Sequence, residues 1–509
     1  LAVNKGLPLG EQGFINLSVE YSSIEATDRS VQRTDAQGLI NDGYAGVPVN
    51  AMVWGLPKVD DDIKVFANFS MALNQDIEFY GYGNFNNKTA EGGFYYRNPS
   101  NRSGVYGDGE ELLIGDLTPN DDLTCPSVSL TGNIPDPIAF SQVLNDPNCF
   151  SFQELIPGGF TPRFGGELTD SALLIGLRGE LNTLSWDLSG YYGKNEADYF
   201  IHNTVNASLG PNTPRDFDPG AYQQEEMNVN ADFVYTLSDQ IAIAFGAEYR
   251  VEEFTIKPGQ VESYIDGGLG DQGFSTSSNG FPGFSPSISG TWDRSNYAAY
   301  TELSVDVSED LLIIGAIRFE DFDDFGSTTN YKIGANYAVS ERFGLRSTIS
   351  TGFKAPTPGQ SNASNLSTQN TEGVLVNQGT IPSSSAVALA AGGKPLEPEK
   401  SENVTLGTYF SVGEIDFTID YFTIDMTDRL NLSSEKELTD AQRLQLIAEG
   451  VSGVNDIAEF RFFTNDFDTN TSALILLPHS IPTGLTASQA GALLIITPAP
   501  RWKTLTLKQ

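Results

Sequence analysis

The chain has very few of the residues that most catalytic and metal sites need. Only two histidines and two cysteines occur among its 509 residues. A Ser-His-Asp triad or a multi-histidine metal site would have to use His202 or His479. His202 stands at the end of a predicted strand, which is typical of a residue at a rim. We therefore predict no catalytic residues, no metal site, no cofactor and no enzymatic activity.

Basic residues are also scarce. The chain has 29 Lys and Arg against 66 Asp and Glu, which gives a net charge of −37. Binding to nucleic acid needs clustered Lys and Arg, so we exclude nucleic acid as a partner. The acidic excess can create a field in loops or in a channel that attracts cations, or it can solvate loops and turns. We favour the second interpretation.

Short acidic runs could offer oxygen ligands to Ca²⁺, but none has the spacing of an EF-hand loop. A glycine-rich run at residues 267–271 also departs from the known calcium repeat. We interpret all of these runs as solvated turns and loops. The acidic runs are residues 60–62, 108–111 and 320–324.

No apolar run approaches the ~18 residues that a membrane-spanning helix needs. Apolar and polar residues alternate instead. In residues 241–251 the odd positions are apolar, as at Ile243 and Phe245, whereas the even positions include Glu248 and Arg250. The same alternation recurs in residues 15–21, 184–192 and 343–353. A soluble β-sandwich also alternates, but its strands are mostly ~5 to 6 residues long, so the longer segments here favour a membrane barrel with a wet interior.

Connections between the predicted strands alternate between short turns and long stretches, which matches the two rims of an outer-membrane barrel. The long stretches lie at about residues 98–168, 202–221, 258–290 and 357–399, and we predict that they are extracellular. We predict fourteen strands, and a fifteenth near residues 456–468. The fourteen lie near residues 13–21, 62–71, 76–86, 90–97, 169–181, 184–200, 223–237, 240–256, 292–307, 311–325, 328–339, 342–354, 401–412 and 415–432.

One predicted strand changes its phase. From Ile415 to Tyr421 the odd positions are apolar, but from Phe422 onward the apolar residues stand at even positions. A β-bulge at Tyr421 and Phe422 would keep the apolar face on one side. Alternatively, the strand leaves the bilayer there and both of its faces meet loops.

The most informative stretch runs from Ser350 to Leu432. It contains S-T-G-F-K-A-P-T-P, then L-E-P-E-K-S-E-N, then I-D-F-T-I-D-Y-F-T-I-D-M-T-D-R-L. This order resembles the late barrel region of TonB-dependent outer-membrane receptors, and the resemblance covers about residues 6–471. In that family the first motif ends one barrel strand and the second opens the next, so the motif residues are structural. They are Gly352, Phe353, Lys354, Ala355, Pro356, Leu396, Pro398, Glu399, Ser401 and Asn403.

The resemblance implies an all-β fold, a transmembrane antiparallel β-barrel. We count about 14 to 15 of the roughly 22 strands expected of such receptors. The chain begins at Leu1 without a signal peptide, and neither a TonB box nor a plug domain can be found in it. We therefore expect residues 1–471 to be part of a receptor barrel whose plug is missing.

The implied function is active uptake of a scarce ligand across the bacterial outer membrane. Such a ligand is a ferric siderophore, cobalamin or an oligosaccharide, and the TonB-ExbB-ExbD complex acts through the missing plug. Lipid and a small molecule are the other expected partners. Arg250, Arg342, Arg346 and Glu248 are expected to face the lumen, where they hold the plug or line the path. A passive porin and a secreted β-rich binding or adhesion protein remain as alternatives, and the residues that contact substrate are not predicted.

The resemblance also bears on the two cysteines, Cys125 and Cys149, which lie in one polar, loop-like stretch. A loop of an outer-membrane protein passes through the oxidising periplasm, so we expect a disulfide between them. Two unrelated free thiols are the alternative.

After Thr471 the sequence changes character. Residues 472–509 lose the alternation, gain four prolines and no longer resemble the family. We suspect a frameshift near codon 471, because a shifted reading can restore strand-like text. A divergent tail is the alternative.

Overall fold

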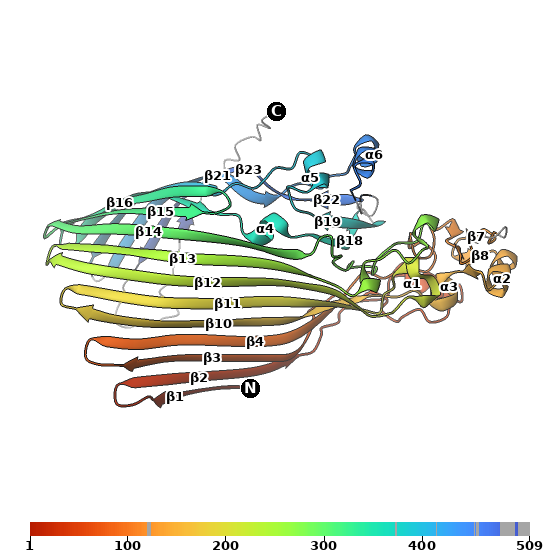
Figure 1. The fold of residues 1–509 in the computed structure, drawn as a ribbon, viewed down its shortest axis with the longest axis horizontal. Coiled ribbons are helices and arrows are strands. Elements are labelled where there is room, and N and C mark those ends of the chain that lie inside the picture. The colour runs from red at the N-terminus through yellow and green to blue at the C-terminus, as the bar shows by residue number, and fades with distance from the viewer. Residues whose placement is uncertain are drawn as a thin grey trace.

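In the computed structural model the chain forms one large antiparallel sheet with a layer of folded loops at one end (Figure 1). The structure describes residues 1–119, 124–371, 374–413, 415–451, 454, 458–478 and 494–496. Within them the sheet has 16 strands, all in sequence order, and it is open, with β1 and β24 at its two ends. Its strands are β1 (Ala2–Pro8), β2 (Gly13–Ile24), β3 (Lys58–Ala72), β4 (Ile77–Gly93), β10 (Arg163–Leu181), β11 (Leu184–His202), β12 (Phe217–Ser238), β13 (Ile241–Pro258), β14 (Gly290–Ser308), β15 (Leu311–Phe322), β16 (Gly326–Ser340), β17 (Phe343–Lys354), β20 (Glu399–Val412), β21 (Ile415–Leu432), β23 (Phe463–Pro478) and β24 (Leu494–Ile496).

The alternation in the sequence divides the sheet into two faces. Phe245 of β13 pairs with Phe233 and Thr301, whereas Glu248 pairs with Asn230 and Ala298. Odd positions of β13 therefore form an apolar face with their neighbours, and even positions form a polar face. This is the two-sided pattern that a sheet between lipid and water requires.

The two ends of the sheet differ in their connections. At one end, which we call the turn rim, turns of two to four residues join the strand pairs from β1–β2 to β20–β21; this end lies on the left in Figure 1. The other end, the loop rim, carries connections of 14 residues or more, with one exception of three residues. The loop-rim connections are residues 25–57, 94–162, 203–216, 259–289, 323–325, 355–398 and 433–462. The predicted alternation of short turns and long loops is present, although the predicted boundaries differ.

Two strand predictions are wrong. The strands predicted at 76–86 and 90–97 are the single strand β4, whose polar run at Asn86 and Asn87 resembles a turn but pairs with both β3 and β10. The first strand, β1, was not predicted, because it is short and carries polar residues. The connection predicted at 98–168 accordingly begins at residue 94 and ends at residue 162.

Of the two alternatives for the phase change in β21, the bulge at Tyr421 and Phe422 is wrong. The pairing of β21 with β20 continues unbroken through both residues. The shift lies further along, between Met426 and Arg429 in the pairing with β23, where Asp428 takes a φ of 55°. Phe422 and the apolar residues after it therefore stay on the polar face, opposite Thr405 and its neighbours.

The loop rim carries two folded lobes. The first lobe consists of residues 25–57, 94–162, 203–216 and 259–289, and a core of buried aromatic residues, among them Tyr106, Phe152 and Phe274, holds it together. The second lobe consists of residues 365–398 and 433–462, whose core includes Val387, Leu446 and Phe460. In Figure 1 the elements of the two lobes gather in separate regions at the loop rim. The first lobe contains α1 (Thr34–Asn41), β5 (Glu111–Leu112), β6 (Gly115–Asp116), β7 (Val128–Thr131), β8 (Ile134–Pro135), α2 (Pro137–Asn145), β9 (Cys149–Phe150), α3 (Phe152–Leu155), η1 (Ala207–Asn212), η2 (Val261–Ser263) and η3 (Gly270–Gln272), and the second contains β18 (Asn365–Thr371), β19 (Val374–Thr380), α5 (Ala386–Ala390), α6 (Asp440–Ala448) and β22 (Glu459–Arg461).

Parallel pairing of β19 with β22 joins the two connections of the second lobe into one unit. A further short helix, α4 (Pro358–Asn362), lies between this lobe and β17. None of the helices in the described ranges is long and apolar enough to cross a membrane.

The suspected boundary at Thr471 falls inside β23, which runs on to Pro478 and pairs with β21. Apart from these residues and β24, the tail lies outside the described residues. The division of the chain at residue 471 stays a prediction.

Cys125 and Cys149 are joined by a disulfide bond in the first lobe, with their Cα atoms 5.7 Å apart. We expect no free thiol per chain when the denatured, unreduced protein is alkylated and weighed, and two after reduction. Two alkylated thiols without reductant would contradict the bond, and a Cys125→Ser variant, which leaves one thiol, calibrates the assay.

Candidate functional site

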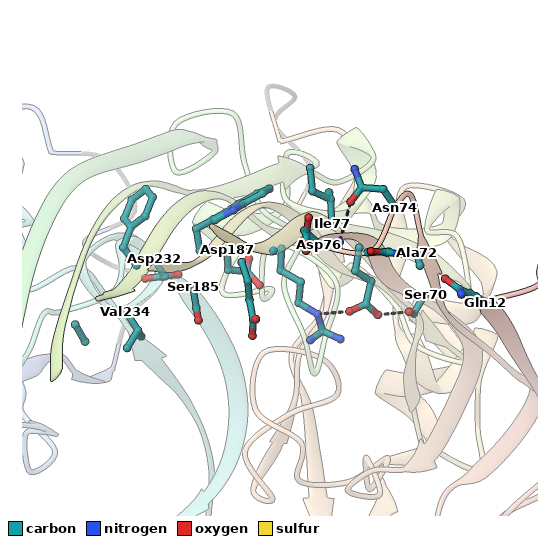
Figure 2. A pocket seen from close by; sticks show the side chains of 18 of the residues that line it. Gln12, Ser70, Ala72, Asn74, Asp76, Ile77, Ser185, Asp187, Asp232 and Val234 are labelled. Carbon is teal, nitrogen blue, oxygen red and sulfur yellow. Dashed lines mark hydrogen bonds and ion pairs between the residues drawn. The ribbon is translucent and has the colours of Figure 1, made fainter. Parts of the chain in front are cut away.

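A cavity of about 520 Å³ lies near the turn rim of the sheet. Residues of the strands from β3 to β14 line it (Figure 2). Arg178, on β10, forms an ion pair with Glu78 on β4, at 2.7 Å, and the other carboxylate contact of Glu78 is the hydroxyl of Ser70. Asp187 and Asp232 also line the cavity and stand directly opposite each other on β11 and β12. Like charges that face each other across a ladder destabilise it, so both carboxylates need compensating partners.

Tyrosine hydroxyls provide these partners. Tyr80 on β4 donates to Asp187 on β11, at 2.7 Å, and crosses β10 to do so. Tyr300 on β14 donates to Asp232 on β12 and crosses β13. Each bond thus links two strands that are not neighbours.

The same arrangement recurs among the ion pairs of the polar face. Arg318 on β15 contacts Glu248 on β13, at 2.9 Å, across β14. Lys332 on β16 contacts Glu302 on β14, and Arg346 on β17 contacts Asp420 on β21. Two cavities lie on the polar face, where long side chains from alternate strands meet above the strand between them. The polar face is thus a hydrophilic surface on which many charged side chains are paired.

Three of the four residues that we expected in the lumen lie on this polar face. Glu248 and Arg250 do so on β13, and Arg346 does so on β17. Arg342 lies in the turn at the turn rim and is exposed, because β17 begins only at Phe343. The prediction for Arg342 is therefore wrong.

The motif residues lie where two strands meet at the loop rim. Gly352, Phe353 and Lys354 end β17 and pair with the start of β20, so that Gly352 stands opposite Ser401 and Lys354 opposite Glu399. The Glu399 carboxylate accepts a bond from the Leu430 backbone N–H at 2.8 Å. Asn403 donates to the Ser401 hydroxyl at 3.2 Å. These contacts are internal to the sheet, so they give the motif an architectural role.

The first lobe contains a buried arginine that the sequence analysis did not single out. Arg97 is 0% exposed; its Nε donates to the Asn279 side chain at 2.6 Å and its Nη1 to the Tyr95 carbonyl at 2.9 Å. Burial lowers the pKa of Arg97 well below its ordinary value, and the nearby positive charge of Arg102 lowers it further. Arg97 thus fastens residues 259–289 to the start of residues 94–162, and no motif spacing could reveal a pairing over 182 positions.

His202 lies at the loop-rim end of β11, with its Nδ1 2.7 Å from a carboxylate oxygen of Glu91. This position agrees with a rim residue. Among the residues that the structure describes, no group of three or more His, Cys, Asp or Glu side chains could hold a metal ion.

Comparison with known proteins identifies the fold. Residues 127–447, more than half of the chain, match the family model described as TonB dependent receptor-like, beta-barrel. The chain belongs to this family. No curated protein sequence gives a significant match.

Solved structures of TonB-dependent receptors share the fold. A siderophore receptor of Acinetobacter baumannii matches with a TM-score of 0.52 and 14% identity, and the match covers 95% of this chain and 57% of that one. A variant of the ferric enterobactin receptor of Pseudomonas aeruginosa matches with a TM-score of 0.51 and 13% identity, again over 95% and 57%. This chain thus spans less than two thirds of the length of these receptors. The predicted antiparallel barrel, incomplete in its strands, is confirmed as the fold, and the sheet is not closed.

We predict that Arg97→Lys loosens the first lobe. Lysine cannot donate to Asn279 and the Tyr95 carbonyl in the planar geometry of a guanidinium, so the opening free energy of the lobe should fall by about 1.5 to 3 kcal/mol. Hydrogen exchange of peptides from residues 94–119 and 259–289 measures this change. Arg29→Lys is the matched control, because Arg29 is exposed in the same lobe. Equal exchange in both variants would contradict the role of Arg97.

Proposed function

We propose that this chain is the barrel part of a TonB-dependent transporter of the bacterial outer membrane. The observation that carries the proposal is the family match over residues 127–447. Two features of the fold support it. The polar face provides a charged, wet wall for a path across the membrane, and the folded lobes at the loop rim provide a surface for ligand on one side only.

In this proposal the longer receptor takes up a scarce small molecule and needs energy to do so. A ferric siderophore is the first ligand to test, since one of the two solved receptors named above is a siderophore receptor by title and the other a ferric enterobactin receptor. Cobalamin and an oligosaccharide remain candidates, because a likeness at this level of identity concerns the fold alone. TonB, with ExbB and ExbD, would act through a plug domain of the longer protein. Residues 1–471 would form the barrel region.

The proposed uptake can be tested on the full-length parent in cells. We expect uptake of a radiolabelled ferric siderophore that depends on the receptor and stops when an uncoupler collapses the proton-motive force. A strain without the receptor gene is the control. Uptake that continues unchanged with the uncoupler would contradict active transport and would favour a passive porin.

We also propose that residues 472–509 follow a frameshift near codon 471. The change of composition after Thr471 supports this idea. The nucleotide sequence tests it, since codons that cannot spell a strand-like continuation in another frame would rule it out.

A further inference from the structure

The loop rim has one low point. The connection between β15 and β16 is only residues 323–325, whereas every other described connection at this rim has 14 residues or more. We call residues 323–325 the sill. No lobe arises from the sill, so any cover over this part of the wall must come from another connection.

Residues 355–364, which we call the strap, begin near the sill. They follow β17, which is separated from β15 by β16 alone. The strap contains α4, whose first turn is closed by a capping box between Thr357 and Gln360, with bonds of 2.9 and 3.1 Å. This short helix fixes the local path of the chain after Pro356.

The strap runs back across the sheet to the polar face of β12, β13 and β14. At its start, the Pro356 carbonyl accepts a bond from Arg294 on β14. In its middle, Gly359 lies against the ring of Phe254 on β13, where an added Cβ would be 3.4 Å from the ring. At its end, the Ser364 carbonyl accepts a bond from the Tyr222 hydroxyl on β12 at 2.8 Å. In Figure 1 α4 lies just above β14, to the right of the end of β15.

The length of the strap fits this crossing. Neighbouring strands lie ~4.8 Å apart, so the way from β17 to β12, over five steps, is about 24 Å. Ten residues can span at most ~33 to 36 Å when fully extended. A strap that includes a helical turn therefore has little slack, and it must pass close over β16 and β15, above the sill.

Arg294 is the strongest of the three fastenings. Its side chain is only 3% exposed, it also binds Glu252, and it lies over the ring of Phe322 at the end of β15, 5.2 Å from the centroid. Asp324 of the sill lies 3.7 Å from the same guanidinium. The Arg294 side chain therefore connects the strap, strands β13 to β15 and the sill.

We propose that the strap covers the loop-rim ends of β15 and β16, above the sill. Arg294 is the positioning residue that keeps the strap there. Release of the strap would open a side entrance over β15 and β16. Only the role of this entrance in ligand access rests on the proposed function. The position of the strap is a property of the fold.

The test measures how easily reagents of two sizes reach the polar face of β16. In the full-length parent, Thr328→Cys places a thiol on the polar face of β16, opposite Glu320 and close to the sill. The two native cysteines are joined to each other, and mass spectrometry of the peptide around residue 328 reports the new thiol. N-ethylmaleimide and a bulky poly(ethylene glycol) maleimide are applied from outside.

In this background we expect Arg294→Met to raise the rate of labelling by the bulky reagent about ten-fold or more, because the charge-assisted bond to the Pro356 carbonyl is lost. Labelling by N-ethylmaleimide should change little. Arg294→Lys should give an intermediate rate, because lysine lacks the planar fork that serves Glu252 and Pro356 together. Arg318→Met is the matched control, since Arg318 binds Glu248 and Glu320 on the same face.

An unchanged rate with the bulky reagent in Arg294→Met would overturn the proposal. So would an equal rise in the Arg318→Met control, which would mean general loosening of the wall. If Arg294→Met fails to fold, Tyr222→Phe removes the hydroxyl that bonds to Ser364 and to the neighbouring Asn365. It should still raise bulky labelling about three-fold, and no rise would count against the strap. Labelling needs no transport, so absent uptake with an intact size effect would contradict the proposed function and leave the strap in place.

Discussion

The common register of the strands is the constraint on which the rest of the structure depends. Each strand pairs with its neighbours so that polar residues gather on one face, as Arg250 meets Asn228 and Asn296. A slip by one residue would move every side chain of a strand to the other face. In a membrane the backbone groups must also find their partners within the sheet. The register therefore pairs the backbone hydrogen-bonding groups and, at the same time, places apolar and polar side chains on opposite faces of the sheet.

The ion pairs and tyrosine bonds of the polar face depend on this register. Arg318, Lys332 and Arg346 each reach a carboxylate two strands away. Bonds of this kind are not confined to the polar face, since Lys257 on β13 binds Glu196 on β11 on the other face, near the loop rim. Each bond links two strands across a third, so these bonds help to fix the relative positions of three strands at a time. A chain with 66 acidic and 29 basic residues can pair only part of its carboxylates in this way, and Asp187 and Asp232 accept from tyrosines instead.

The sequence predicts the strands well because alternation is a local signal, and β13 and β17 follow it closely. It fails where local signals mislead. Asn86 and Asn87 resemble a turn, yet the strand continues through them because both neighbours pair with it. The phase change after Tyr421 resembles a bulge, yet the ladder with β20 tolerates apolar residues on the polar face. The lobes are beyond local prediction altogether, since contacts such as that of Arg97 with Asn279 join distant parts of the chain.

The motif G-F-K-A-P shows how far local sequence reaches at the candidate site. Pairing of β17 with β20 ends at Lys354, and Pro356 lacks the N–H that a further ladder bond would need. Pro358 then begins α4, a position that suits its fixed φ. The motif thus ends the strand and sets the first direction of the strap. Its destination depends on Arg294 and Tyr222, which belong to strands far earlier in the chain. A residue at which a loop begins can be recognised from the sequence around it. A residue that binds the loop from a distant strand can be recognised only in the folded sheet, where the two lie together.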